Sequence, residues 1–411
     1  MVKTYAKTLR RMFKANIVRF IAISMIIAIG IALVTGIGTL PLQIRDSLVS
    51  AAFAPEQRAA VNELADKVEL ISFIFPTFFI AVSALTALTT MTRLVDEERP
   101  VFACFKTLGY SGFSIVFRYV LFAVVCAAAG CVIGLAVGNF LLRPVMFNTV
   151  QTKFNLPDAE KILYLSQGLI WSAVMSAAVA LTALSVGWRR CREKPAELLR
   201  PKAPKAGKKI FLEKMPFFWK RLKFKFKSSV RNILRFKGRL IMTVLSVMGS
   251  TVMLFCGIGL FGSINSDKNQ NIQDLAAFTE SMSVIAAAII LFAAALTVLV
   301  LFNLTNINIE ERKKEIATLK VLGYNQIEVA GFIYREIMIL SVIGIAAGLP
   351  SGYFFLGFIF DYIDFGSLDL VKWHVWVLTV VAAALSVLIA DVLLYRKIKR
   401  IEMHTSLKTV E

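Results

Sequence analysis

The most constraining feature of the sequence is a series of eight long apolar runs. They cover roughly residues 17–38, 70–92, 114–142, 167–188, 240–264, 282–304, 329–360 and 374–395. About 20 consecutive apolar residues are enough to cross the hydrocarbon core of a bilayer as a helix. Strands of a membrane barrel alternate apolar and polar residues and would not give such uninterrupted runs. The sequence therefore predicts an all-α polytopic membrane protein with eight transmembrane helices.

The distribution of positive charge predicts the orientation of these helices. The chain carries 47 lysines and arginines and a formal net charge of +20. If the N-terminus is cytoplasmic and the spans alternate, most of these residues fall in cytoplasmic segments, above all between Arg189 and Arg239. The outer segments hold the remainder, which is Arg45, Arg58, Lys67, Arg143, Lys153, Lys161, Lys268 and Lys372. By the positive-inside rule, both termini are expected in the cytoplasm.

Other protein classes lack support in the residues. The sequence contains no recognisable nucleic-acid-binding motif, so we interpret the excess of basic residues as a topology signal and expect no nucleic-acid partner. The first apolar run exceeds the roughly 7–15 residues of a signal-peptide core, so we interpret it as an uncleaved anchor. The chain contains no P-loop motif, no H-E-x-x-H and no G-x-S-x-G. We therefore expect no enzymatic activity, no metal site and no cofactor in this chain.

The sequence contains an internal repeat. Residues 97–110 read EERPVFACFKTLGY, and residues 310–324 read EERKKEIATLKVLGY. Glu97, Glu98, Arg99, Lys106 and Gly109 of the first copy correspond to Glu310, Glu311, Arg312, Lys320 and Gly323 of the second. Self-similarity over a fixed offset is the signature of a duplicated structural unit.

The repeat divides the chain into two tandem four-helix halves, a 4+4 arrangement. We assign residues 1–200 to the first four-span half, 201–237 to a basic amphipathic linker, and 238–411 to the second half. Because each half has an even number of spans, the two copies enter the membrane in the same direction and form a parallel repeat. Such a chain corresponds to a fused dimer.

Each repeat contains a short charged helix between its second and third spans. In the first copy Val101, Phe102, Phe105 and Leu108 form an apolar stripe at helical spacing, and Ile316, Leu319 and Leu322 do so in the second. Gly109 and Gly323 are placed to end these helices in a left-handed conformation. Such a helix can transmit a movement of a cytoplasmic partner to the two spans that flank it. Alternatively, it is a solvated hinge at the membrane surface.

Glycines recur at four-residue spacing in the third and seventh spans. They are Gly130, Gly134 and Gly138 in the first half, and Gly344, Gly348 and Gly352 in the second. Small-xxx-small faces allow helix backbones to approach closely. The pattern is compatible with ordinary packing inside each bundle, and also with a moving pair formed by the third and seventh spans.

The linker has the pattern of an interfacial helix. Its apolar face consists of Phe218, Leu222, Phe226, Val230 and Ile233, and basic residues fill the other face. This pattern is typical of a helix that lies on a bilayer with an anionic inner leaflet. The segment Arg10 to Lys14 before the first span looks like a shorter version of the same element. The alternative for the linker is a solvated basic connector.

Polar residues within the spans lie close to the cytoplasmic side. They are Asn303, Asn306, Asn308, Arg335, Glu336 and Asp391. Snorkelling or local pairing accounts for groups at this depth. Since no ladder of charges crosses the bilayer centre, an ion-coupled relay has little support.

The duplicated motif resembles the FtsX-like (MacB-like) permease family of ABC transporters. In that family the segment between the second and third spans has an E-R-x-x-E-I-x-x-L-x-x-L-G pattern. The second copy matches it through Glu311, Arg312, Glu315, Ile316, Leu319, Leu322 and Gly323, and the first through Glu98, Arg99, Phe102, Phe105, Leu108 and Gly109. The first copy departs by carrying Pro100 and lacking an equivalent of Glu315. Residues 189–200 look like the family's closing motif.

The resemblance implies a bacterial inner-membrane permease with two coupling helices. These would dock onto two copies of a cytoplasmic ABC ATPase, which would bind ATP and magnesium, and their acids and bases would pair across that interface. The large extracytoplasmic domain usual in the family is missing, since the expected outer loops cover only about residues 39–69 and 265–281. An extracytoplasmic partner remains open. The rival interpretations are a membrane scaffold that regulates an envelope enzyme or sensor, and a gradient-driven secondary carrier.

Overall fold

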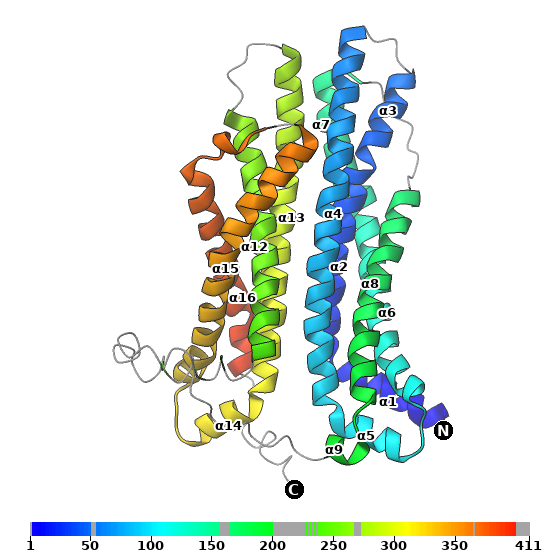
Figure 1. Cartoon of the computed structure of the whole chain (residues 1–411), viewed down its shortest axis with the longest axis vertical. Helices are drawn as coiled ribbons and strands as arrows, with labels where there is room; N and C mark the ends of the chain where they lie inside the picture. The colour runs from blue at the N-terminus through cyan, green and yellow to red at the C-terminus, as the bar shows by residue number, and fades with distance from the viewer. Residues whose placement is uncertain are drawn as a thin grey trace.

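The structure, a computed structural model, describes residues 2–50, 55–156, 165–199, 237–266, 273–364 and 366–399, with the single positions 227, 231 and 234. Throughout these residues the regular structure is helical, and Figure 1 shows long helices that run side by side between two ends of the molecule. Eight segments are long and apolar enough to cross a membrane, which confirms the predicted fold class.

Each half contributes four long helices and shorter connecting ones. The first half contains α1 (Val2–Ala15), α2 (Ile17–Gly38), α3 (Leu40–Ser50), α4 (Pro55–Glu97), α5 (Arg99–Thr107), α6 (Gly112–Val137), the π-helical turn η1 (Gly138–Leu142), α7 (Arg143–Phe154), α8 (Leu165–Cys191) and α9 (Pro195–Leu199). The second half contains α12 (Lys237–Ser266), α13 (Gln273–Glu311), α14 (Lys313–Val321), α15 (Gln326–Ile363), the 3-10 turn η3 (Leu368–Leu370) and α16 (Trp373–Lys399).

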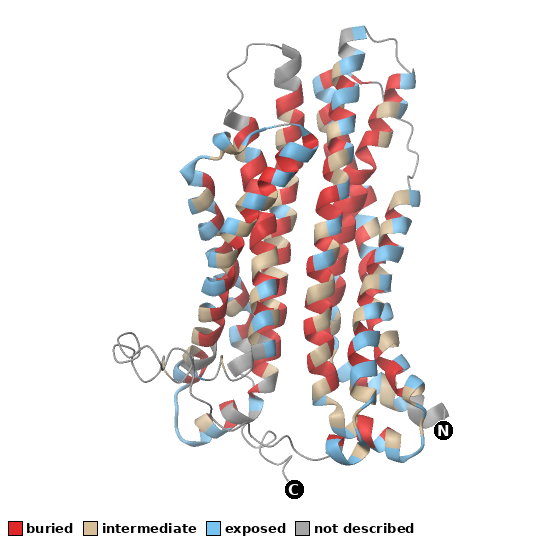
Figure 2. Cartoon of the chain, viewed as in Figure 1, coloured by how far each residue is buried: buried red, intermediate tan, exposed pale blue. Residues whose placement is uncertain are grey.

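The helix order repeats between the halves, as the sequence predicted. The spans α2, α4, α6 and α8 correspond to α12, α13, α15 and α16, and α5 corresponds to α14. The first span of each half is the most buried, whereas only 28% and 33% of the central residues of the fourth spans α8 and α16 are buried. Figure 2 shows this contrast between the central and the peripheral helices. Apolar exposed faces on the outer helices are what lipid contact requires.

The two halves share one continuous apolar core. They meet along α2 and α4 on one side and α12 and α13 on the other. Buried side chains from both halves, including Phe75 and Phe79 of α4 with Phe255 of α12 and Ile289 of α13, belong to one cluster. Within this seam the Asn303 amide donates a 2.8 Å hydrogen bond to the Thr90 hydroxyl. These two residues occupy equivalent positions of the repeat, so the contact lies at the pseudo-symmetry axis.

The lower end of the bundle in Figure 1 carries α1, α5, α9 and α14. Both short charged helices, α5 and α14, therefore lie at the same end of the bundle, as expected from the repeat. The apolar linker residues Phe218, Leu222, Phe226, Val230 and Ile233 lie outside the described residues, so the predicted linker helix stays a prediction.

At the upper end, the described residues of the expected outer loops are helical. Residues 40–50 form α3 and residues 55–69 form the first turns of α4, α7 continues the third span, and α13 begins at Gln273. The reason is an apolar pattern at helical spacing that continues beyond the long run: Val61, Leu64, Ala65 and Val68 are all buried. With 43 residues, α4 is about 64 Å long at the rise of an α-helix, well beyond the thickness of a bilayer core.

Candidate functional site

The candidate site consists of α5 and α14 with the helix ends that hold them. Both helices end at a glycine with positive φ, +81° at Gly109 and +84° at Gly323, which confirms the predicted left-handed conformation. In α5 the Tyr110 N–H donates to the Phe105 carbonyl at 3.1 Å, and Gly109 N–H to Lys106 at 3.2 Å. The corresponding bonds in α14 are both 3.1 Å. This pair of bonds is the Schellman helix ending, and it turns the chain sharply into the next span.

The apolar stripe of the short helices is only partly as predicted. Phe102 and Phe105 of α5 and Ile316 of α14 are buried. The last members of each stripe, Leu108 and Leu322, are 70% and 68% exposed. The Schellman turn explains the difference, because the chain reverses at the helix end and leaves the preceding side chain pointing away from the bundle.

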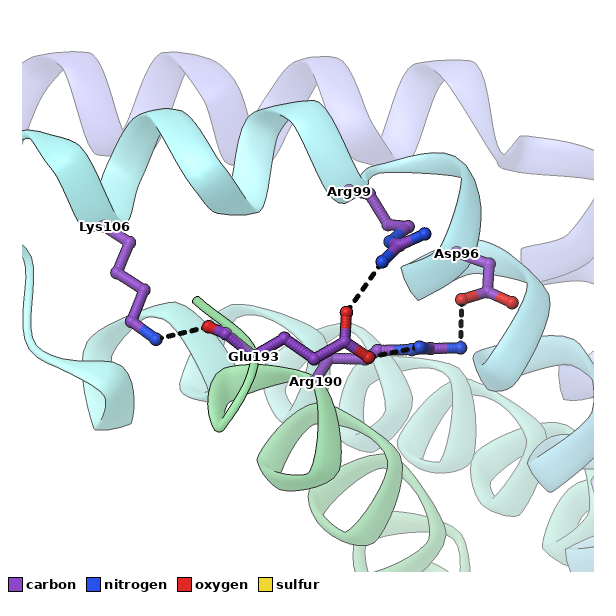
Figure 3. Close-up of polar contacts among 5 residues, drawn as sticks. All are labelled: Asp96, Arg99, Lys106, Arg190 and Glu193. Carbon is purple, nitrogen blue, oxygen red and sulfur yellow. Dashed lines mark hydrogen bonds and ion pairs between the residues drawn. The ribbon is translucent and has the colours of Figure 1, made fainter. Parts of the chain in front are cut away.

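Glu193, in the turn between α8 and α9, anchors α5 to the fourth span. Its carboxylate accepts a 2.7 Å hydrogen bond from Arg99 Nη2 and is also paired with Arg190. Arg190 forms a further ion pair with Asp96, and Lys106 Nζ donates to the carbonyl oxygens of Cys191 and Glu193, each at 2.7 Å. Figure 3 shows the carboxylate of Glu193 between the two arginines. Asp96, Arg99, Lys106, Arg190 and Glu193 are called the Glu193 clamp below.

The electrostatics of the clamp favour its ionised form. Burial raises the pKa of Glu193, but the hydrogen bonds and charges of Arg190 and Arg99 outweigh this effect and leave the pKa below its ordinary value. Hydrogen bonds in which both partners are charged are among the strongest in proteins. The clamp therefore fixes α5 at both its first and its last turn.

Two acidic residues at the junction of α4 and α5 are held by other spans. Arg19 of α2 pairs with both carboxylate oxygens of Glu97, at 2.6 and 2.8 Å. Glu98 accepts 2.9 Å hydrogen bonds from Arg118 and from the Tyr119 hydroxyl of α6. We expected these acids to pair with a partner protein. Within the chain both carboxylates are already paired with arginines of neighbouring spans, and the pairing with a partner protein stays a prediction.

In the second half the junction carries a buried ion pair. Arg312, just before α14, pairs with Glu336 of α15, and the two residues are only 5% and 3% exposed. Lys320 is also buried, and burial lowers its pKa. Glu310 lies in the last turn of α13 and is partly exposed. The side chains of Glu311 and Glu315 lie outside the described residues, so their predicted role is untested.

The glycine faces pack against the first span of the same half. A Cβ on Gly130 or Gly134 would meet the Ser24 or Ala28 carbonyl of α2 at 2.5 or 2.7 Å. Likewise Gly138 faces Thr35 of α2, and Gly344, Gly348 and Gly352 face Val247, Thr251 and Phe255 of α12. The packing interpretation is therefore correct. The moving pair formed by the third and seventh spans is not how these faces are used.

Several residues of the site were missed by sequence reasoning. In the sequence Arg19 and Arg118 are simply two of the many cytoplasmic basic residues, and nothing distinguishes Glu193 within the closing motif at residues 189–200. One signal was available, because an arginine inside an apolar run needs a carboxylate nearby. Local pairing was expected for Glu336, and the structure gives it Arg312 as the partner.

Comparison with known proteins agrees with the repeat. The family model of the FtsX-like permease C-terminal region matches the chain twice, at residues 73–190 and 287–403. No curated protein and no solved structure gave a match. Each matched region contains one short charged helix with its flanking spans, and together the two regions cover more than half of the sequence. The chain therefore belongs to the FtsX-like permease family.

Proposed function

We propose that this ABC transporter-type permease uses α5 and α14 to receive motion from a separate cytoplasmic ATPase and to pass it into its spans. The family makes the chain a multi-pass inner-membrane component of such a transporter. ATP and magnesium would be bound by the partner.

The observation that carries the proposal is the exposed apolar turn at the end of each short helix. Leu108 in the first half, and Val321, Leu322 and Tyr324 in the second, are exposed at the lower end of the bundle. Contiguous exposed apolar residues mark interaction sites, as Val321, Leu322 and Tyr324 do in the second half, and Leu108 occupies the position equivalent to Leu322 in the first. The two turns form the same structure in both halves, which suits two copies of one partner.

The contacts around α5 and α14 suit a rigid lever. The Glu193 clamp joins α5 to α8, Arg19 joins the last residue of α4 to α2, and Arg118 joins Glu98, just before α5, to α6. In the second half, the Arg312–Glu336 pair joins the start of α14 to α15. A force on either exposed turn would therefore reach the spans with little loss in a flexible connection.

The orientation follows from the charge distribution and completes the proposal. The lower end would face the cytoplasm, together with both termini. The helical upper end formed by α3, α4 and α7 would face the opposite side, where an extracytoplasmic partner could contact it. We infer that the chain acts as a pseudo-dimer with two ATPase copies beneath it.

The test is co-purification of the detergent-solubilised chain with its ATPase from the native host. The wild-type chain should retain two ATPase copies, Leu108→Asp or Leu322→Asp alone should retain one, and the double variant should retain none. Val49→Asp, which changes an exposed apolar residue in α3, is the matched control and should behave like the wild type. Absence of any ATPase from a well-folded wild-type sample would refute the proposal and favour the scaffold interpretation.

A further inference from the structure

The first helix, α1, presents a basic face on which none of the described residues is packed. Lys7, Arg10, Arg11 and Lys14 are exposed. The helix sequence, VKTYAKTLRRMFKA, contains no acidic residue that could neutralise them. The cations fall at helical spacing on the part of the helix turned away from the bundle. Like charges at i,i+4, such as Lys7 with Arg11 and Arg10 with Lys14, weakly destabilise a helix, and an anionic partner would offset this.

The opposite face of α1 is fixed on the bundle. Met12 is buried, and Leu9 and Phe13 pack against the core of the first half. The ring of Phe13 lies 4.9 Å from the ring of Phe122 in α6. Figure 1 shows α1 lying across the lower end, crosswise to the spans. The position of the basic face is therefore set by packing.

Exposed apolar residues next to α1 show where the membrane ends. Ile17, Ile21 and Met25 of α2, and Phe113 and Phe117 of α6, are exposed at the lower ends of their spans. Acyl chains are the partner that such residues in a spanning helix require. Lys14 of the basic face lies three positions before Ile17 in the sequence, so this face borders the apolar end of α2, as expected of a helix at the boundary between headgroups and acyl chains. This placement favours lipid over protein as the occupant.

We propose that the basic face of α1 binds the phosphate headgroups of acidic phospholipids, and that this binding holds α5 in its docking position. The proposal concerns the regulation of the coupling helix and rests on the proposed function. Basic clusters near a membrane surface are attracted to anionic lipid by about 1 kcal/mol per residue, which is roughly a fivefold effect.

A short polar chain of contacts connects α1 to α5. Asn16 breaks the helix between α1 and α2, and its side chain donates to the Met12 carbonyl at 3.0 Å. Arg19 Nη1 donates to the Asn16 oxygen at 3.0 Å and to Glu97 at 2.8 Å. Glu97 is the last residue of α4, and α5 begins at Arg99. A change in the position of α1 would therefore move Asn16 and Arg19, and with them Glu97, which lies just before the first turn of α5.

The experiment measures backbone hydrogen exchange of residues 99–107 in lipid nanodiscs by mass spectrometry. The full chain without ATPase is compared in phosphatidylcholine and in phosphatidylcholine with phosphatidylglycerol. We expect exchange in α5 to be slower in the acidic discs by roughly fivefold, the effect of one headgroup contact. The exchange of α3 residues 40–50, at the opposite end of the bundle, serves as the reference and should not change.

Variants separate the lipid site from the connection to α5. Arg10→Gln/Arg11→Gln should abolish the lipid response, whereas Arg189→Gln/Lys313→Gln removes the same number of exposed charges and should preserve it. Arg19→Gln should retain bound phosphatidylglycerol in native mass spectra but lose the α5 response. A response that persists in Arg10→Gln/Arg11→Gln, or disappears equally in the control, would overturn the proposal. Since no ATPase is present, failure of ATPase co-purification would leave this result unaffected.

Discussion

The buried ion pair between Arg312 and Glu336 gives the sharpest prediction. The two side chains are 6% and 4% exposed, so each neutralises a charge that water cannot reach. Removing one partner leaves the other charge buried and unpaired, which typically costs about 3–5 kcal/mol. Replacing both with apolar residues of similar volume is usually close to neutral. Arg312→Met and Glu336→Leu should therefore each destabilise the chain strongly, while the double variant should resemble the wild type.

The expected shift in melting temperature follows from these energies. At about 2–4 °C per kcal/mol for a unit of this size, a loss of 3 kcal/mol corresponds to a decrease of about 6–12 °C. The assay is thermal denaturation in detergent, followed by size-exclusion chromatography of a fluorescent fusion. Lys313→Met, which removes an exposed cation at the start of α14, should remain within about 1 kcal/mol of the wild type. If both single variants have the melting temperature of the wild type, the ion pair does not stabilise the junction and the reasoning fails.

The remaining predictions concern the clamp, the glycine faces and the seam. Glu193→Gln should increase hydrogen exchange in α5 by roughly tenfold, the effect of about 1.4 kcal/mol, because a charged hydrogen-bond acceptor is lost. Since the folded-state pKa of Glu193 lies below the ordinary 4.5, its stabilisation should be complete above about pH 5 and disappear as the pH falls through that lowered pKa; a flat profile would contradict this. Gly348→Ala should cost about 1–3 kcal/mol in thermal stability because its Cβ would lie 2.7 Å from α12, whereas Gly331→Ala, with no atom within 4 Å, should be neutral or stabilising. Asn303→Leu should weaken the seam by about 0.6–1.7 kcal/mol; unchanged melting would show that the hydrogen bond contributes nothing.

The repeat itself was accessible from the sequence. Long apolar runs can satisfy their backbone in a membrane only as helices, so the eight spans follow from composition and length. The positions of Gly109 and Gly323 predict left-handed helix ends for a local reason, since only glycine adopts that conformation without strain. Both features depend on residues close together in the chain, and local chemistry is enough to determine them.

Only the tertiary structure decided the partners of the charged groups. Glu97 and Glu98 were as compatible with a docking surface as with internal pairing, because nothing local distinguishes the two cases. Arg19 lies 78 residues from Glu97 in sequence, and Arg99 lies 94 from Glu193. These pairs form because the packing of spans brings their ends to one level.

The choice of helix neighbours was also beyond the sequence. The spacing of Gly130 and Gly344 shows that a backbone approaches closely, but any apolar helix could supply that backbone. The structure selects α2 and α12, the most buried spans of each half. Close packing depends on the shapes of two surfaces at once, and a single sequence pattern describes only one of them.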